Sequence, residues 1–142
     1  MQQRGYMKKL KFPKPKKVSI SKLKKKAWAL CSQFIRQKYA VNGIDTCYTC
    51  GAKKPWKQMQ AGHGIGGRYN NVLFMEEVIR PQCPGCNLWG GGKYSIFAEK
   101  LIKQYGAERY SQFIMLTNVP KQFKAYELEA IIDIYKRKLE EL

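Results

Sequence analysis

Two Cys-x-x-Cys pairs constrain this chain more than any other feature of its sequence. They read CYTCG at Cys47–Gly51 and QCPGCN at Gln82–Asn87, and they bracket the one histidine of the chain, His63. Two thiolates in a tight turn can reach one ion, and two such turns supply the four tetrahedral sulfurs that zinc prefers. The sequence therefore predicts a structural zinc site whose ligands are Cys47, Cys50, Cys83 and Cys86.

The cysteines and the N-terminus indicate an intracellular protein. Four of the five cysteines belong to the two pairs, which fits metal binding in a reducing compartment better than a disulfide framework. The fifth, Cys31, lies among apolar residues at helical spacing, so we expect a buried thiol. The N-terminus has no apolar segment of a secretory signal, and no apolar run could cross a bilayer. We therefore expect a protein that is not secreted and that has no membrane partner.

The basic residues are unevenly distributed along the chain. The formal net charge is +17, and residues 1–75 hold 17 Lys and Arg against one acid, Asp45. A polyanion is the natural partner of such a segment, and nucleic acid is the commonest polyanion. No basic amphipathic helix with a large aromatic face supports a membrane surface as the alternative.

The pattern of residues predicts one domain of the α+β class behind a basic arm. Lysines and prolines in residues 1–20 predict an extended arm. Residues 21–142 are expected to form a single domain, with a zinc-bound core over 47–94 and a helical part over 95–142. Ser21 is the expected N-cap of a helix to about Tyr39, whose exposed lysines would contact phosphates: Lys22, Lys24, Lys25 and Lys26.

Short strands and three further helices complete the expected domain. Residues 56–61 are expected to form a strand that leads into His63, and residues 72–74 and 78–79 a second short strand. Helices are expected from about 93 to 105, around 108–116, and from Pro120 to the C-terminus. The apolar face of the last helix would pack on the domain or on a partner chain.

The chemistry of His63 is the central question that the zinc site leaves open. A neutral imidazole near a phosphodiester could take a proton from water and so generate an attacking hydroxide. A second, hard cation, Mg²⁺ or Mn²⁺, would stabilise the phosphate and would need oxygen ligands. The nearest candidates in the sequence are Asn87 and either Glu76 or Glu77. The residues alone leave two interpretations open: a nuclease, and a zinc-stabilised nucleic-acid-binding module without chemistry.

The motifs together resemble those of the phage NinG/Rap recombination nucleases, within the HNH, or His-Me finger, endonucleases. The matching pieces are C-x-x-C-G, A-G-H, F-x-E and Q-C-x-x-C-N, at Cys47–Gly51, Ala61–His63, Phe74–Glu76 and Gln82–Asn87. The resemblance covers roughly residues 20–106. It implies a ββα-metal core, branched DNA such as Holliday junctions or D-loops as substrate, and the cytoplasm of a bacterial host if a phage encodes the chain.

The same resemblance assigns roles to individual residues. It implies His63 as the general base, Asn87 as a cation ligand and Glu76 as a ligand or a residue close to the cation. The chain departs from the pattern at three positions: Gly62 replaces an acid or histidine before the base, Gln60 replaces a second histidine, and Val78 stands near the expected asparagine.

Further DNA contacts and the oligomeric state are also predicted. Arg68 and Lys93 are candidate phosphate contacts. Tyr69 and Trp89 could stack on unpaired bases, although core packing is the favoured expectation for both. A branched substrate offers two equivalent strands, which favours a homodimer, and the last helix is the expected pairing surface.

Overall fold

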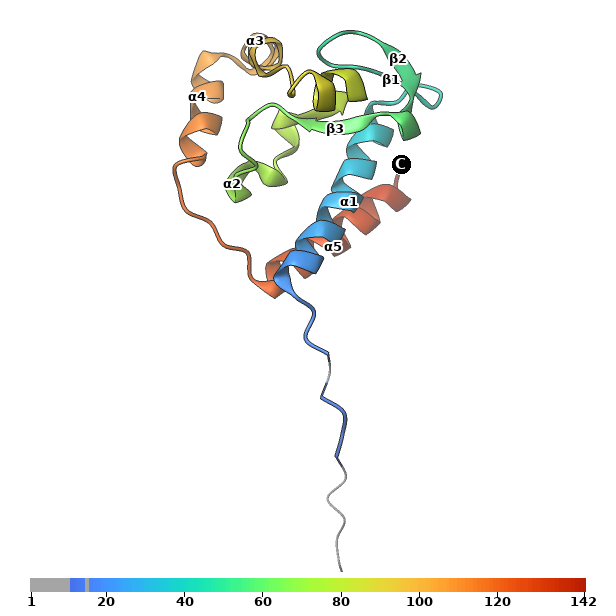
Figure 1. The fold of residues 1–142 in the computed structure, drawn as a ribbon, viewed down its shortest axis with the longest axis vertical. Coiled ribbons are helices and arrows are strands. Elements are labelled where there is room, and N and C mark those ends of the chain that lie inside the picture. Colours follow the sequence, from blue (N-terminus) through green and yellow to red (C-terminus); the bar gives the residue numbers. More distant parts are fainter. Residues whose placement is uncertain (1–10, 15) are drawn as a thin grey trace, which may run out of the picture.

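The computed structural model describes residues 11–14 and 16–142, and it places helices around two small antiparallel sheets (Figure 1). Residues 11–14 and 16–19 are exposed, form no helix or strand, and lead away from the folded part of the chain. The rest of the predicted arm, residues 1–10 and 15, lies outside the described residues.

The longest helix, α1 (Ile20–Tyr39), follows the apolar periodicity of the sequence. Its N-cap is Ser19, whose side chain accepts a hydrogen bond from the Lys22 amide at 3.2 Å. The prediction of Ser21 as the N-cap is therefore wrong by two residues. One face of the helix is buried, and it consists of Leu23, Ala27, Cys31, Phe34 and Ile35.

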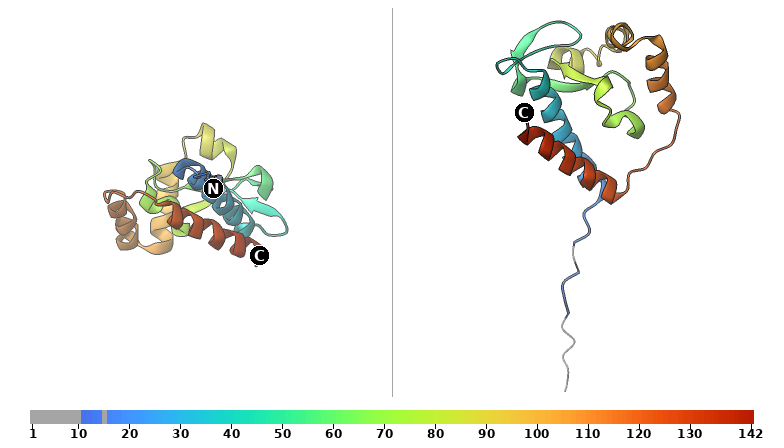
Figure 2. Two further views of the ribbon diagram at one scale, coloured as in Figure 1. Left: turned by 90° about the horizontal axis from the view of Figure 1, so that it is seen from below. Right: turned by 180° about the vertical axis from the view of Figure 1, so that it is seen from behind.

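The last helix, α5 (Ala125–Glu140), lies beside α1 and runs in the same direction (Figures 1 and 2). Its Leu128 and Ile132 form a buried cluster with residues of the first half of α1. The expected start at Pro120 is wrong, because the Glu127 carboxylate accepts a hydrogen bond from the Lys124 amide and so fixes the first turn there. The apolar face of this helix is used within the chain, against α1.

Two two-stranded sheets lie between the helices. Strand β1 (Ile44–Thr46) pairs with β2 (Lys53–Pro55), and β3 (Gln60–His63) pairs with β4 (Ile79–Gln82), both antiparallel. The register of the second pair joins Gln60 to Gln82 and His63 to Ile79. Figure 1 shows β3 crossing the upper part of α1.

Two of the strand predictions need correction. The expected strand over residues 56–61 is a 3₁₀ turn at Trp56–Gln58 followed by β3. Residues 72–74 belong mainly to the short helix α2 (Asn70–Leu73), and the true partner strand is β4. The Asn71 side chain donates to the carbonyls of Leu116 and Val119, which ties α2 to the end of α4 and overrides the strand propensity of this apolar run.

Helices α3 (Tyr94–Tyr105) and α4 (Ala107–Leu116) close the domain on the other side of the β3–β4 pair. Phe97 and Leu101 of α3 and Phe113 of α4 are fully buried in the main core, which also holds Cys31 and Ile35 of α1. The mixture of helices and small antiparallel sheets confirms the predicted α+β class. Within residues 11–14 and 16–142, no helix combines the length and apolarity needed to cross a membrane.

Candidate functional site

The four cysteines of the two pairs converge on one point. Cys47 and Cys50 follow β1, and Cys83 and Cys86 follow β4. Their sulfurs all lie within 4.8 Å of one another, and the Sγ atoms of Cys50 and Cys83 are 3.6 Å apart. Four tetrahedral zinc–sulfur bonds of about 2.3 Å place the sulfurs about 3.8 Å apart. The cluster therefore fits a zinc ion, as the spacing of the cysteines predicts.

Hydrogen bonds favour the thiolate form at Cys47, whereas burial and the neighbouring thiols raise the pKa of Cys50 and of Cys86. Burial alone would raise the pKa of the Cys47 thiol, but hydrogen bonds with the backbone of Cys83, Cys50 and Thr49 and with the Thr49 hydroxyl outweigh it. The net effect lowers the pKa of Cys47 to about 6. The remaining cysteine, Cys31, is buried in the core with a pKa raised by burial to about 11, as expected for a structural thiol.

His63 ends strand β3 with an imidazole that has no hydrogen-bond partner. Both ring nitrogens are shielded from solvent, and the edge of the ring meets the Trp28 indole at a centroid distance of 4.9 Å. Burial, together with the positive charge of Arg68, lowers the pKa of His63 to about 4, so the ring is neutral near neutral pH. Buried polar atoms without partners are rare and call for an explanation.

Asn87 lies beside Gln60, which is at the end of β3 opposite to His63. It belongs to the π-helical turn Gly85–Trp89, and its backbone amide donates a hydrogen bond to the Cys83 carbonyl. Its side-chain nitrogen donates to Gln60 Oε1 at 2.7 Å. Gln60 and His63 are three residues apart, which corresponds to about 10 Å along an extended strand. Strand β3 thus carries His63 at one end and contacts Asn87 at the other, and no hydrogen bond between described residues joins His63 to Asn87 directly.

The two glutamates are engaged elsewhere in this structure. Glu76 Oε1 accepts hydrogen bonds from Tyr135 and Lys138 of α5, and its Oε2 lies 3.5 Å from Lys38 Nζ of α1. Glu77 forms a two-point ion pair with Arg109, with one contact of 2.5 Å. Neither carboxylate hydrogen-bonds to His63 or Asn87. A cation-ligand role for Glu76 requires the exchange of these partners and stays a prediction.

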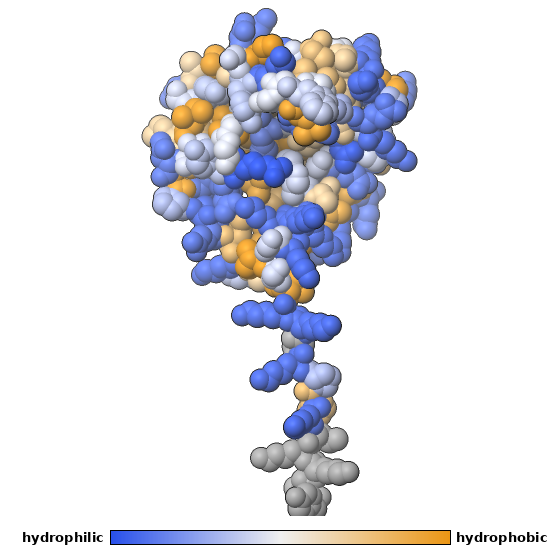
Figure 3. All heavy atoms as spheres, in the orientation of Figure 1, coloured by the Kyte–Doolittle hydropathy of each residue, from blue (hydrophilic) through white to orange (hydrophobic). Residues whose placement is uncertain are grey.

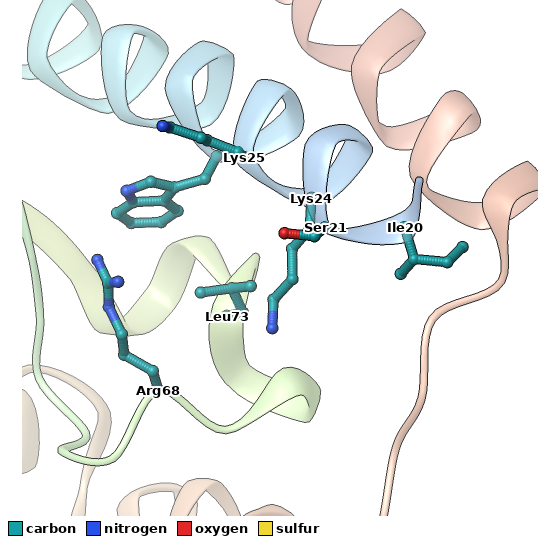
Figure 4. A pocket seen from close by; sticks show the side chains of 7 residues that line it. Ile20, Ser21, Lys24, Lys25, Arg68 and Leu73 are labelled. Carbon is teal, nitrogen blue, oxygen red and sulfur yellow. The ribbon is translucent and has the colours of Figure 1, made fainter. Parts of the chain in front are cut away.

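A basic groove lies next to Trp28, whose indole contacts the His63 ring, but His63 itself lines neither part of the groove. The groove consists of two adjoining hollows of about 660 and 400 Å³, and both are lined by Trp28 and Arg68. Lys24 and Lys25 line the first hollow, whereas Arg36, Gln60, Asn87 and Leu88 help to line the second. No Asp or Glu lines either one. In Figure 4, Arg68 reaches toward α1 from the loop before α2, and Lys24 extends from α1 toward Leu73.

Three of the six residues predicted to contact DNA line the groove. Lys24, Lys25 and Arg68 line it, whereas the other three are exposed outside it: Lys22, Lys26 and Lys93. The prediction that Tyr69 and Trp89 pack in the core is wrong, because Trp89 is 87% exposed and Tyr69 is 46% exposed.

Two residues that line the groove were not identified from the sequence, although their spacing along α1 could have shown them. Trp28 and Arg36 lie on α1 with Lys24 and Ser32, at intervals of four residues. Residues four apart on a helix share one face. The stripe could have been found because it combines two cations, a hydroxyl and an indole along one line of α1 that borders the buried apolar face.

Arg80 of β4 is a structural residue that the motifs did not reveal. Arg80 is buried, and its guanidinium donates to the carbonyls of Glu76, Glu77 and Ile79 and to the Tyr105 hydroxyl. It also lies within 6 Å of three tyrosine rings: Tyr39, Tyr48 and Tyr105. Its five donors fit carbonyl and aromatic partners that no sequence pattern identifies.

Comparison with known proteins supports a single family assignment. A family model described as "NinG: Bacteriophage Lambda NinG protein" matches residues 2–142. The comparisons with curated proteins and with solved structures gave no match.

Proposed function

We propose, from the premise that this chain belongs to the bacteriophage lambda NinG family, that it is a metal-dependent DNA endonuclease. The observation that carries the proposal is the neutral, buried His63, whose ring packs against Trp28 at a groove lined by cations and by Asn87 of the zinc-linked turn. A titratable group with a perturbed pKa beside a cleft is a typical feature of catalytic sites. The order β3, β4 and then the turn Gly85–Trp89 agrees with a ββα-metal core.

The proposed reaction is hydrolysis of a backbone phosphodiester. An unprotonated ring nitrogen of His63 takes a proton from water, and the resulting hydroxide attacks phosphorus opposite the leaving 3′ oxygen, which leaves 5′-phosphate and 3′-hydroxyl ends. Arg36 and Arg68 would contact the phosphate and offset the negative charge that develops on it. Both residues line the second hollow of the groove, Arg36 from α1 and Arg68 from the loop before α2.

The structural zinc and the catalytic cation have different ligand sets. The four thiolates would fill the coordination of zinc, so the zinc would act as a clamp for the site. A bound Mg²⁺ or Mn²⁺ would stabilise the charged phosphate, with Asn87 as the one side chain of the motif that offers a free amide oxygen at the groove. Because such ions prefer several oxygen ligands, most of the others would be substrate phosphate and water, and binding without DNA should be weak.

Because the imidazole of His63 is covered, the proposed reaction requires a conformational change. Trp28 and Arg68 must move aside before water and a phosphate can reach the ring nitrogens. Their movement would admit water, and the pKa of His63 would rise from about 4 toward its ordinary value. A base with a pKa closer to the working pH is the more effective one. Substrate binding in the groove is therefore proposed to activate the base.

The same shielding favours a second candidate function. If the imidazole stays covered, the chain is a zinc-stabilised nucleic-acid-binding module, and the basic groove is its binding surface.

The two functions are separated by incubating the zinc-loaded protein with linear, forked, looped and four-way DNA, with and without Mn²⁺ or Mg²⁺. The nuclease predicts cation-dependent cuts, most rapidly in branched DNA. The binding module predicts complexes that weaken steeply with salt and intact DNA under every condition.

A further inference from the structure

The second zinc-linked turn carries an exposed apolar tip that the proposed chemistry does not use. Trp89 is 87% exposed and Leu88 is 60% exposed, directly after the candidate residue Asn87. An indole is among the largest apolar groups of a protein and usually finds a partner. Two such side chains in succession at the edge of a groove therefore indicate a binding surface.

The tip is held firmly by its own backbone. The amides of Asn87, Gly90 and Gly92 donate to the carbonyls of Cys83, Gly85 and Cys86, at 2.9, 2.7 and 2.9 Å. A Cβ at Gly90 would lie 2.9 Å from the Cys86 carbonyl oxygen, so glycine is required for this close fold. Cys86 anchors the turn to the four-sulfur cluster. The backbone that carries Trp89 is thus held in place before any partner binds.

The surroundings of the tip define the chemistry of its partner. Leu88 lines the same hollow as Arg36, Arg68 and Asn87, and Lys93 follows four residues after Trp89. No acid occurs between Glu77 and Glu99 in the sequence. The charged residues that line this groove are all cations, and Trp89 adds an indole directly after the lining residue Leu88. This combination fits a ligand that has both negative charge and flat aromatic faces, as an unpaired strand of nucleic acid does.

We propose that Trp89 stacks on an unpaired base at a branch or loop of DNA whose backbone lies in the basic groove. In a continuous duplex both faces of each base are already stacked, so the indole would gain a base only by disrupting the helix. At a branch point or loop the face is free. Trp89 is thereby a specificity-determining residue that favours distorted DNA. The inference rests on the proposed function for the identity of the ligand, and it concerns binding and not cleavage.

The test measures binding by full-length, zinc-loaded protein that carries His63→Ala, without added Mg²⁺ or Mn²⁺, so that no DNA is cut. Fluorescence anisotropy gives the Kd for a four-way junction, a looped duplex and a continuous duplex, at one salt concentration. Trp89→Ala is expected to weaken binding to junction and loop about tenfold or more, and binding to the duplex less than about twofold. Trp89→Phe, which keeps an aromatic face, should restore most of the loss.

Two controls make the outcome specific. Tyr126 of α5 is also exposed, at 65%, and lines none of the described grooves near the site, so Tyr126→Ala should change no Kd. A 2-aminopurine at the unpaired position should change its fluorescence on binding to the parent protein and not to Trp89→Ala. Unchanged junction binding by Trp89→Ala, or an equal loss on the continuous duplex, would overturn the inference and leave the tip as a surface for a protein partner.

The result is independent of catalysis. If junction binding depends on Trp89 but the protein that retains His63 cuts no DNA in Mn²⁺ or Mg²⁺, the nuclease is refuted and the inference stands. If that protein cuts DNA but junction binding does not depend on Trp89, the inference is refuted and the nuclease stands.

Discussion

The residue before His63 is a glycine because the neighbouring strand leaves no room for a side chain. A Cβ at Gly62 would lie 1.8 Å from Gln82 Oε1. The Gln82 side chain cannot easily give way, because it is fully buried and its Nε2 donates to Thr49 Oγ1 and to the Gly92 carbonyl. The departure from the family pattern at this position therefore has a packing cause. An acid or histidine at position 62 could not serve as a cation ligand here.

Gly62→Ala tests this account at the level of one methyl group. The added carbon forces Gln82 to leave its buried partners, and we expect a loss of about 1–3 kcal/mol in the free energy of unfolding. Urea titration followed by far-UV circular dichroism measures it.

Gly66→Ala is the matched control for Gly62→Ala. Its Cβ would meet only the Tyr94 ring, at 3.3 Å, so it should cost much less. A second substitution, Gln82→Ala, should remove most of the penalty of Gly62→Ala. Equal stability losses for Gly62→Ala and Gly66→Ala would contradict the packing explanation.

The four cysteines join the β1–β2 hairpin to the β3–β4 pair, which are separate two-stranded sheets. Cys47 and Cys50 follow β1, and the second pair follows β4, so the cluster ties the β1–β2 hairpin to the end of the β3–β4 pair. Strands of three and four residues are too short to be stable alone. The metal is therefore expected to supply much of the stability of this half, since structural zinc contributes on the order of 10 kcal/mol in small domains.

Cys83→Ser should abolish zinc binding and the cooperative unfolding of the zinc-bound half. A protein-bound zinc assay and thermal melting followed by near-UV circular dichroism check both effects. The matched control is Cys31→Ala, because Cys31 is buried in the core away from the cluster, so that its loss should lower stability slightly and leave the zinc content unchanged. Retained zinc and an unchanged melting transition in Cys83→Ser would refute the four-thiolate site.

The elements divide into those that local sequence determines and those that contacts determine. Helix α1 and the zinc cluster could be predicted because apolar periodicity and cysteine spacing are local signals. The pairing of β3 with β4 could not, because the apolar run at residues 72–74 has strand character but is held as helix by the bonds of Asn71. The positions of Glu76 and Asn87 depend on partners distant in sequence, such as Lys138 and Gln60.

Along the whole chain, positive charge gathers in the half that contains α1 and His63. Residues 1–75 hold 17 Lys and Arg, and their single acid, Asp45, is fully buried, so the described surface of this half presents no carboxylate. Five of the ten acids lie on α5 or directly after it: Glu127, Glu129, Asp133, Glu140 and Glu141. Figure 3 shows hydrophilic residues over much of the visible face, with hydrophobic residues in separate patches. This asymmetry favours a DNA path along α1 and the described part of the N-terminal segment.

The most direct test of the central claim is the single-turnover rate at which the zinc-loaded protein cuts a four-way DNA junction in Mn²⁺, compared with that of His63→Ala. If His63 is the general base, the substitution should lower the rate at least about a hundredfold, with unchanged zinc content and junction Kd. Cutting by His63→Ala at the rate of the unsubstituted protein would contradict the role of His63, and the absence of cutting by both would contradict the nuclease itself.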